Sequence, residues 1–311
     1  MFTHVLFGTD LSPASERALD CLARWKRFGL TTVTLAHVHD FHSSEGLEER
    51  LRLEHEPKME RQRKFLLSRG VQASSRFAVG IPQIDLDRIA QEEGCEAIVV
   101  GSHGASWLAE VMMGSIADAV VRHSAFPVFV IKVNKLVDLS EEACEAACTS
   151  MFTDVLFPTD LSDETEGAVA LVERLCRNHK STVRLLHVIE QRGLGHLASD
   201  GHVTETVAQE QLGALAARLV AVGASSVLVD IIHGHTTDAI LHEIEARKPG
   251  LVVVGKHGRG HLAEMLLGST SHALARSSAA PVVIVPRSLR GADLASASTA
   301  GSGESRGSHH A

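Results

Sequence analysis

The chain carries one glycine motif twice, about 150 residues apart, and this repetition constrains its fold more than any other feature. Gly101-Ser102-His103-Gly104 is followed by nine residues and then Gly114-Ser115. Gly255-Lys256-His257-Gly258 is followed by nine residues and then Gly268-Ser269. Each copy follows an apolar run, so each predicts a strand, a glycine-bearing loop and then a helix. Such a loop lets backbone N–H groups approach a phosphate without interference from Cβ atoms.

The repeat extends over nearly the whole chain. Residues 1–12 match residues 151–162, and His37-Val38 matches His187-Val188 at the same offset of 150. Internal repetition therefore predicts one domain written twice. We expect a first domain at 1–134, a linker at 135–150, a second domain at 151–288 and a tail at 289–311. The tail is rich in Ser, Ala and Gly without an apolar period, and we expect it to be disordered.

Bulk properties narrow the partners and the compartment. A length of 311 residues suits two domains, each with its own core. The net charge of -8 leaves no basic face for nucleic acid, and no apolar run is long enough to span a membrane, so we expect neither as a partner. Five scattered cysteines do not form a disulfide framework and favour a cytoplasmic location. Cys144 and Cys148, four apart, are either a metal or redox pair or, as we favour, small apolar residues on one side of a linker helix.

Short apolar segments alternate with helical ones in both repeats. In the first repeat, strands are expected at 5–7, 32–38, 76–79, 97–100 and 127–133, and helices at 47–68, 84–92 and 115–123. A further helix should begin at the Ser12-Pro13 cap signal, and Pro57 should break the 47–68 helix. The second repeat has strands near 155–157, 182–188, 227–232, 251–254 and 281–285. This alternation predicts an α/β fold with a parallel sheet covered by helices on both faces.

Several of these segments together resemble the universal stress protein family. They are Val155-Leu-Phe-Pro-Thr-Asp-Leu-Ser162, His187-Val188, the run from Gly255 to Ser271, and Ala280-Pro-Val-Val-Ile-Val285. The resemblance covers both repeats and is to the ATP-binding subtype. It implies two doubly wound domains, each a five-stranded parallel sheet in the order 3-2-1-4-5. Strands one and four are then neighbours at the point where the winding reverses, which is where open α/β sheets bind ligands.

The motifs and the resemblance together predict two pockets for an adenine nucleotide. In the second repeat the expected residues are Pro158, Thr159, Asp160, Val188, Gly255, His257, Gly258, Arg259, Gly268, Ser269 and Thr270. In the first they are Thr9, Asp10, Val38, Gly101, His103, Gly104, Gly114 and Ser115. The helix starts at Gly114-Ser115 and Gly268-Ser269 suit phosphates. The resemblance places the aspartates on the nucleoside and the valines on the adenine, with Mg²⁺ or Mn²⁺ held through the phosphates of ATP.

Each of these assignments has a purely structural alternative. The glycine-serine pairs could be ordinary turns with a helix cap, the aspartates could cap helices beside Ser12 and Ser162, and the valines could be core residues. His103 and His257 could be neighbours of phosphate or ribose, or loop histidines that contribute only backbone. The first repeat also departs from the family pattern, with Gly8 in place of Pro158 and Ala105-Ser106 in place of Arg259-Gly260. We therefore expect its pocket to bind nucleotide more weakly.

Other motifs carry less weight. His37, His39 and His42 form one histidine cluster and His233 with His235 a second, and zinc could bind there, but neither has a compelling ligand pattern. Residues 250–256 mimic most of a Walker A loop, but the middle of that segment is a strand and His257 stands where Ser or Thr is needed. Residues 258–263 mimic a dinucleotide fingerprint, but they follow the fourth strand rather than the first.

The function predicted from the sequence is a cytoplasmic ATP-binding stress-response protein that senses or regulates. One rival is a slow ATPase or phosphotransfer enzyme in the same pocket, although we identify no Walker lysine or arginine finger. Another is a dimeric scaffold with one degenerate or differently liganded pocket. The apolar fifth strands, 127–131 and 281–285, should lie at sheet edges, and we expect the two repeats to pair through them, as single-domain relatives pair into dimers.

Overall fold

The computed structural model describes residues 2–40, 48–102, 113–132, 141–190, 204–258 and 267–287. The expected tail at 289–311, residues 135–140 of the expected linker and the centres of both glycine motifs lie outside these ranges. The predicted site residues His103, Gly104 and Arg259 therefore also lie outside the described residues.

Strands and helices alternate in both halves of the chain, as the repeat predicts. The first half contains β1 (His4–Gly8), α1 (Pro13–Arg24), η1 (Trp25–Phe28), β2 (Thr32–Asp40), α2 (Glu48–Ser68), β3 (Gln72–Gly80), α3 (Pro82–Glu92), β4 (Ala97–Gly101), α4 (Ser115–His123) and β5 (Val128–Ile131). The connecting helix α6 (Glu141–Thr153) leads into β6 (Asp154–Pro158), η3 (Asp163–Thr165), α7 (Glu166–His179), β7 (Thr182–Glu190), α8 (Glu205–Ala221), β8 (Ser226–Gly234), α9 (Thr236–Arg247), β9 (Leu251–Gly255), α10 (Ser269–Ser277) and β10 (Val282–Val285).

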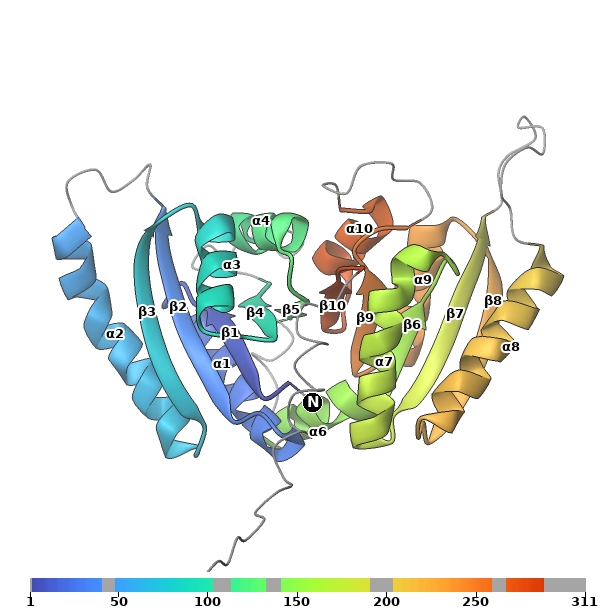
Figure 1. Cartoon of the computed structure of the whole chain (residues 1–311), viewed down its shortest axis with the longest axis horizontal. Helices are drawn as coiled ribbons and strands as arrows, with labels where there is room; N and C mark the ends of the chain where they lie inside the picture. The colour runs from blue at the N-terminus through green and yellow to red at the C-terminus, as the bar shows by residue number, and fades with distance from the viewer. Residues whose placement is uncertain are drawn as a thin grey trace, which may run out of the picture.

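All ten strands form one sheet in the order β3-β2-β1-β4-β5-β10-β9-β6-β7-β8. Strands within each half are parallel, and β1 and β6 lie between the second and fourth strands of their halves. The two halves meet where β5 and β10 pair antiparallel, with Phe129 opposite Val283. Figure 1 shows the resulting pseudo-twofold arrangement, with β5 and β10 at the centre and α2 and α8 at the two ends.

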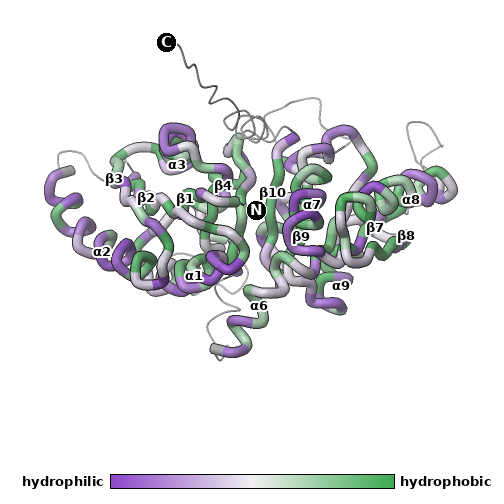
Figure 2. Tube along the Cα trace, turned by 60° about the horizontal axis from the view of Figure 1, so that its bottom comes forward, coloured by the Kyte–Doolittle hydropathy of each residue, from purple (hydrophilic) through white to green (hydrophobic). Residues whose placement is uncertain are grey.

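Two apolar cores, one on each face of the sheet, run across both halves. One core packs beneath α1, α2, α6, α7 and α8 and includes Trp25, Phe129 and Phe152. The other packs beneath α3, α4, α9 and α10 and includes Leu86, Val120 and Leu274. Hydrophobic residues accordingly gather in the central strands, and hydrophilic ones on outer helices such as α2 and α3 (Figure 2). In the described part of the chain, no helix is both long enough and apolar enough to cross a membrane.

Local sequence signals account for the start of α1. Ser12 caps α1 by accepting a hydrogen bond from the Ser15 backbone N–H at 3.2 Å, and Pro13 occupies the first turn, as expected.

The predicted break at Pro57 is wrong, because α2 runs unbroken through it. Met59 and Leu66 on α2 are buried against the sheet while Pro57 is exposed. We attribute the unbroken helix to this packing, which offsets the hydrogen bond that proline cannot make.

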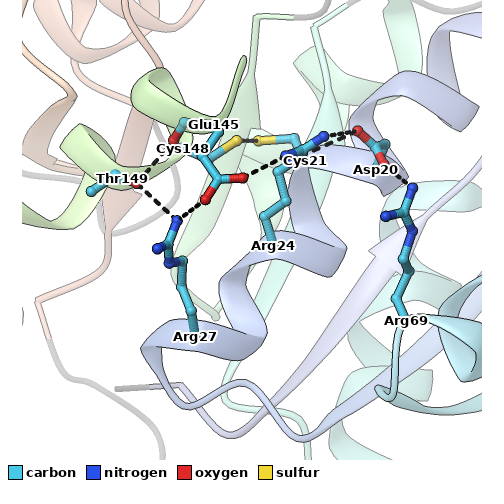
Figure 3. Close-up of polar contacts among 8 residues, drawn as sticks. All are labelled: Asp20, Cys21, Arg24, Arg27, Arg69, Glu145, Cys148 and Thr149. Carbon is cyan, nitrogen blue, oxygen red and sulfur yellow. Dashed lines mark hydrogen bonds and ion pairs between the residues drawn. The ribbon is translucent and has the colours of Figure 1, made fainter. Parts of the chain in front are cut away.

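Helix α6 joins the halves by packing on α1. Glu145 of α6 forms ion pairs with Arg24 at 3.0 Å and with Arg27, which also donates to Thr149 at 3.2 Å (Figure 3). Below these charges, the sulfur atoms of Cys148 and Cys21 lie 2.9 Å apart as free thiols. Cys148 is thus a buried helix residue that has a thiol partner on α1, Cys21, besides its helix neighbour Cys144.

Candidate functional site

A cavity of about 320 Å³ opens in the second half at the carboxyl ends of β6 and β9. It is lined by ten of the eleven residues predicted for this half, namely Pro158, Thr159, Asp160, Val188, Gly255, His257, Gly258, Gly268, Ser269 and Thr270. Further lining residues were not predicted from the sequence, among them His187 and Glu190 on β7 and Thr236 and Ile240 on α9. Thr236 and Ile240 follow Gly234, which ends the third strand of its half as Gly80 does in the first, and this recurrence was the available signal.

A second cavity of about 280 Å³ occupies the equivalent place in the first half. Six of the eight residues predicted there line it: Thr9, Asp10, Val38, Gly101, Gly114 and Ser115. Pro82 and Leu86 of α3 and His37 of β2 complete much of its wall. Both cavities therefore lie beside the strand pair where the winding of each half reverses.

The aspartate at each cavity is held in place by the turn that follows its strand. Oδ1 of Asp160 accepts hydrogen bonds from the Ser162 N–H at 3.0 Å and the Ser162 hydroxyl at 2.7 Å. Asp10 accepts the same two bonds from Ser12, at 3.1 and 2.6 Å, and a third from the Ser15 hydroxyl. These bonds brace the turn before the helix, whereas the N-cap positions belong to Ser12 and Ser162. They also fix each carboxylate at the rim of a cavity.

The turn is under local backbone strain in both halves. Leu161, which follows Asp160, has φ 60°, and Leu11 has φ 62°, a left-handed conformation that leucine rarely adopts. Thr159 and Thr9 stabilise it by accepting the leucine N–H at 3.0 Å. Such strain at equivalent positions is typical of sites that must aim a side chain.

Gly258 lies directly against Asp160. A Cβ at Gly258 would lie 2.7 Å from Asp160 Oδ2, a separation that real Cβ atoms essentially never show. The glycine therefore permits the motif loop to approach the aspartate. Gly268 differs, because it has φ -58° and a Cβ there would meet nothing closer than 3.4 Å. No neighbouring protein atom therefore requires a glycine at 268, so a steric need for a residue without Cβ there would come only from a bound ligand.

Helices α4 and α10 begin at the cavities without side-chain caps. Gly114 and Gly268 stand at the N-cap positions, and neither helix has a side-chain hydrogen bond there. The first-turn N–H groups and the positive end of the helix dipole therefore face each cavity. Ser271 turns its hydroxyl toward the Gly255 carbonyl at 2.7 Å instead. An anionic group is what such a helix start attracts.

Lys256 points away from the cavity, toward the other half. Its Nζ donates to the Ser124 carbonyl at the end of α4 at 2.8 Å. Lys132 reciprocates by donating to the carbonyls of Ala275 and Arg276 at the end of α10. Burial lowers the pKa of Lys256, and it lowers that of Lys132 to about 8. Both lysines lie at the negative ends of helices from the opposite half. Lys256 therefore does not face the cavity, as the lysine of a Walker A loop would, and the 250–256 segment lacks the geometry of that loop.

The second histidine cluster is split between two exposed carboxylates. His233 lies 3.5 Å from Glu205, and His235 lies 3.5 Å from Asp238. The structure thus places each of these two histidines beside a carboxylate of its own. In the first cluster His37 and His39 lie together, and His42 is outside the described residues.

The two halves form a tandem of doubly wound α/β domains, and each domain has a cavity at the point where the winding of its sheet reverses. Residues 1–132 and 151–286 both match the universal stress protein family, and the chain belongs to that family. A universal stress protein of Methanocaldococcus jannaschii is 30% identical over 155 residues, covering 42% of this chain and 96% of the relative. One of Mycobacterium tuberculosis is 28% identical over 228 residues, 71% of each chain.

A solved structure has the same tandem architecture. The universal stress protein from Archaeoglobus fulgidus DSM 4304 superposes with a TM-score of 0.73 at 22% identity, covering 93% of this chain and all of the other. At this identity the likeness establishes the fold alone.

Proposed function

We propose that the chain binds ATP in both cavities and acts as a nucleotide-dependent sensor or regulator in a stress response. The observation that carries the proposal is the repeated pairing of a fixed aspartate with an uncapped helix start across one cavity. The aspartates, Asp10 and Asp160, follow the first strand of each half. The helix starts, at Gly114 and Gly268, follow the fourth strand. In a nucleotide, the sugar hydroxyls suit the carboxylate and the phosphates suit the helix N-terminus.

The walls of each cavity include apolar surface that suits a flat apolar group. Val188, Leu186 and Ile240 contribute apolar surface in the second half, and Val38, Ala36 and Leu86 do so in the first. An adenine ring matches this surface. Each cavity therefore combines apolar surface, a carboxylate and a helix start that attracts anions, which together match the chemistry of ATP.

A divalent ion, Mg²⁺ or Mn²⁺, would be held mainly through the phosphates of ATP. Of the described residues that line the second cavity, only Asp160 and Glu190 are carboxylates. One oxygen of Asp160 is already engaged by Ser162. This donor set is too small for an all-protein magnesium site, but it suits an ion that brings phosphate oxygens with it.

The proposed role is sensing rather than rapid turnover. The described lining of both cavities includes no lysine or arginine, and Lys256 is directed to the other half. Phosphoryl transfer depends on such cations and on a positioned base. A slow ATPase in the second half is the alternative that would use the same geometry.

Calorimetry with Mg-ATP on the full chain tests the proposal. Asp160→Ala should weaken binding in the second half and Asp10→Ala in the first, and the double variant should bind weakly at both. Asp163→Ala is the matched control, because Asp163 is exposed, lies three residues away and does not line the cavity. Unchanged ATP affinity in the double variant would overturn the proposed site.

A further inference from the structure

Three histidines of the first half converge between the sheet and α2. One ring nitrogen of each of His37, His39 and His55 lies within 4.8 Å of the others. His37 and His39 alternate with Val38 on β2 and so point to the same face of the sheet. His55 comes from α2, on the helix face that buries Met59 and carries His55 toward β2. The ring centroids of His37 and His55 are 4.6 Å apart.

The hydrogen bonding of His37 leaves one nitrogen available. Its Nδ1 lies 2.8 Å from the Thr9 carbonyl oxygen, which can only accept, so Nδ1 carries the proton. Nε2 then holds a lone pair, and it is buried without a hydrogen-bond partner in a side chain that is 8% exposed. A histidine that donates one ring N–H to a backbone carbonyl and offers the other nitrogen is the usual arrangement of a metal ligand.

His55 shows the same division between its two ring nitrogens. Its Nδ1 is buried without a hydrogen-bond partner, while Nε2 lies 4.0 Å from Glu54 Oε1. Burial lowers the pKa of both His37 and His55, because it disfavours the charged imidazolium. Neutral imidazole is the form that binds metal ions.

The second half supplies a natural comparison. His187 makes the same 2.8 Å bond to the Thr159 carbonyl, so this bond belongs to the fold of both halves. The position of His39, however, is held by Ile189. Counting back from Gly70 and Gly223, which follow the two helices, Ala208 stands where His55 does. The fold therefore does not need histidines at 39 and 55, and their presence in one half calls for another explanation.

We propose that His37, His39 and His55 form a zinc site, with His37 binding through Nε2 and His55 through Nδ1. Three neutral imidazoles with a fourth position left for water suit zinc. Zinc–nitrogen bonds of about 2.0–2.1 Å place tetrahedral ligands about 3.3 Å apart. The three ring nitrogens lie within 4.8 Å of one another, so small side-chain movements of the half-buried His39 and His55 toward the fixed His37 would reach this spacing.

Zinc here would tie α2 to the strand that borders the first cavity. His37 also lines that cavity, and its Nδ1 proton is bonded to Thr9, another lining residue. Occupation of the site would thus stiffen the wall of the first cavity. No equivalent constraint exists in the second half, where Ile189 and Ala208 cannot bind metal.

Zinc titration of the full, chelator-stripped chain against a chromogenic chelator tests the site. The variant His39→Ala/His55→Ala should bind one zinc fewer per chain, or bind it with an affinity lowered by more than roughly 100-fold, which is the most that loss of a residue that only supports a ligand costs. The His55→Ala change copies Ala208 of the second half, so the helix should be retained, and circular dichroism checks this. His233→Ala/His235→Ala, which removes the same number of histidines, should bind zinc as the unaltered chain does.

Two further readouts separate this site from other histidines. Cobalt should give the strong visible absorption of a four-coordinate ion in the unaltered chain and lose it in His39→Ala/His55→Ala. Zinc should raise the melting temperature of the unaltered chain but not that of this variant. Equal zinc affinity and stoichiometry in the two chains, as binding by the tail histidines would produce, would overturn the proposal.

Discussion

Asp118 and His272 occupy equivalent positions in the two repeats, 154 residues apart, and they meet at 2.6 Å where α4 packs against α10. His272 Nε2 lies within hydrogen-bond distance of both Asp118 Oδ1 and Arg122 Nη2, at 2.6 and 2.8 Å, and Arg122 Nε donates to the other carboxylate oxygen at 2.7 Å. In a homodimer of identical halves, this position would bring like residues together. Divergence of the repeats has instead placed a complementary pair on the pseudo-twofold axis, which favours pairing of the first half with the second.

This pair predicts a pH-dependent contribution to the interface. Burial opposes ionisation of Asp118, but the hydrogen bonds from Arg122 and His272 outweigh it and lower its pKa below the ordinary value of 3.8. Since the folded-state pKa is lowered, the stabilisation is complete above the ordinary value and is lost as the pH falls through the folded one. Asp118→Asn should therefore lower the free energy of unfolding by about 1–3 kcal/mol at neutral pH, and by less in acid.

Urea denaturation of both proteins at neutral and acidic pH measures this difference. Glu92→Gln is the control, because the ion pairs of Glu92 with Arg88 and Arg76 are exposed and such pairs contribute little. A difference between Asp118→Asn and the unaltered chain that grows on acidification would contradict the assignment.

The β5–β10 pairing predicts that Phe129→Pro loosens the two halves from each other. Proline removes a backbone donor from the strand that pairs with β4 on one side and β10 on the other. The Phe129 ring also packs edge-on against Phe2 and Trp25, so Phe129→Leu is needed to isolate the loss of the aromatic contacts. Small-angle scattering and limited proteolysis should show a less compact chain for proline than for leucine. Identical behaviour of the two variants would show that the backbone pairing contributes little.

We predict that ATP binds the second half more tightly than the first. The second cavity is the larger, and Pro158 stiffens its rim where the first half has Gly8. Gly268→Val should abolish the tighter calorimetric site and Gly114→Val the weaker one. Both glycines have φ near -58°, a conformation open to valine, so a loss would reflect occlusion of ligand rather than strain. If Gly114→Val removes the tighter site, the ranking is wrong.

Hydrolysis of ATP should be slow, with turnover well below the ~1 s⁻¹ at the low end of ordinary enzymes. The physical reason is the lack of lysine or arginine among the described cavity residues. A phosphate-release assay measures it. Turnover near ordinary rates that disappears in Asp160→Ala would establish the enzyme alternative instead.

The fold and the cavity walls were accessible from the sequence because the repeat and its strand-loop-helix spacing are local patterns. Placement of Asp160 beside Gly258 follows from the neighbouring first and fourth strands. Lys132 and Lys256 were not anticipated, since each reaches a helix end more than 130 residues away in the opposite half. His55 was missed because its meeting with His37 depends on the rotation of α2 relative to β2, and Pro57 suggested that this helix was broken.

The most direct test of the account is mass spectrometry of the small molecule that the full chain retains after incubation with Mg-ATP and removal of free ligand. The account predicts an adenine nucleotide, released on denaturation, with occupancy that falls in Gly268→Val and disappears in Gly114→Val/Gly268→Val. Retention of a different molecule, or of none, by the unaltered chain would contradict it.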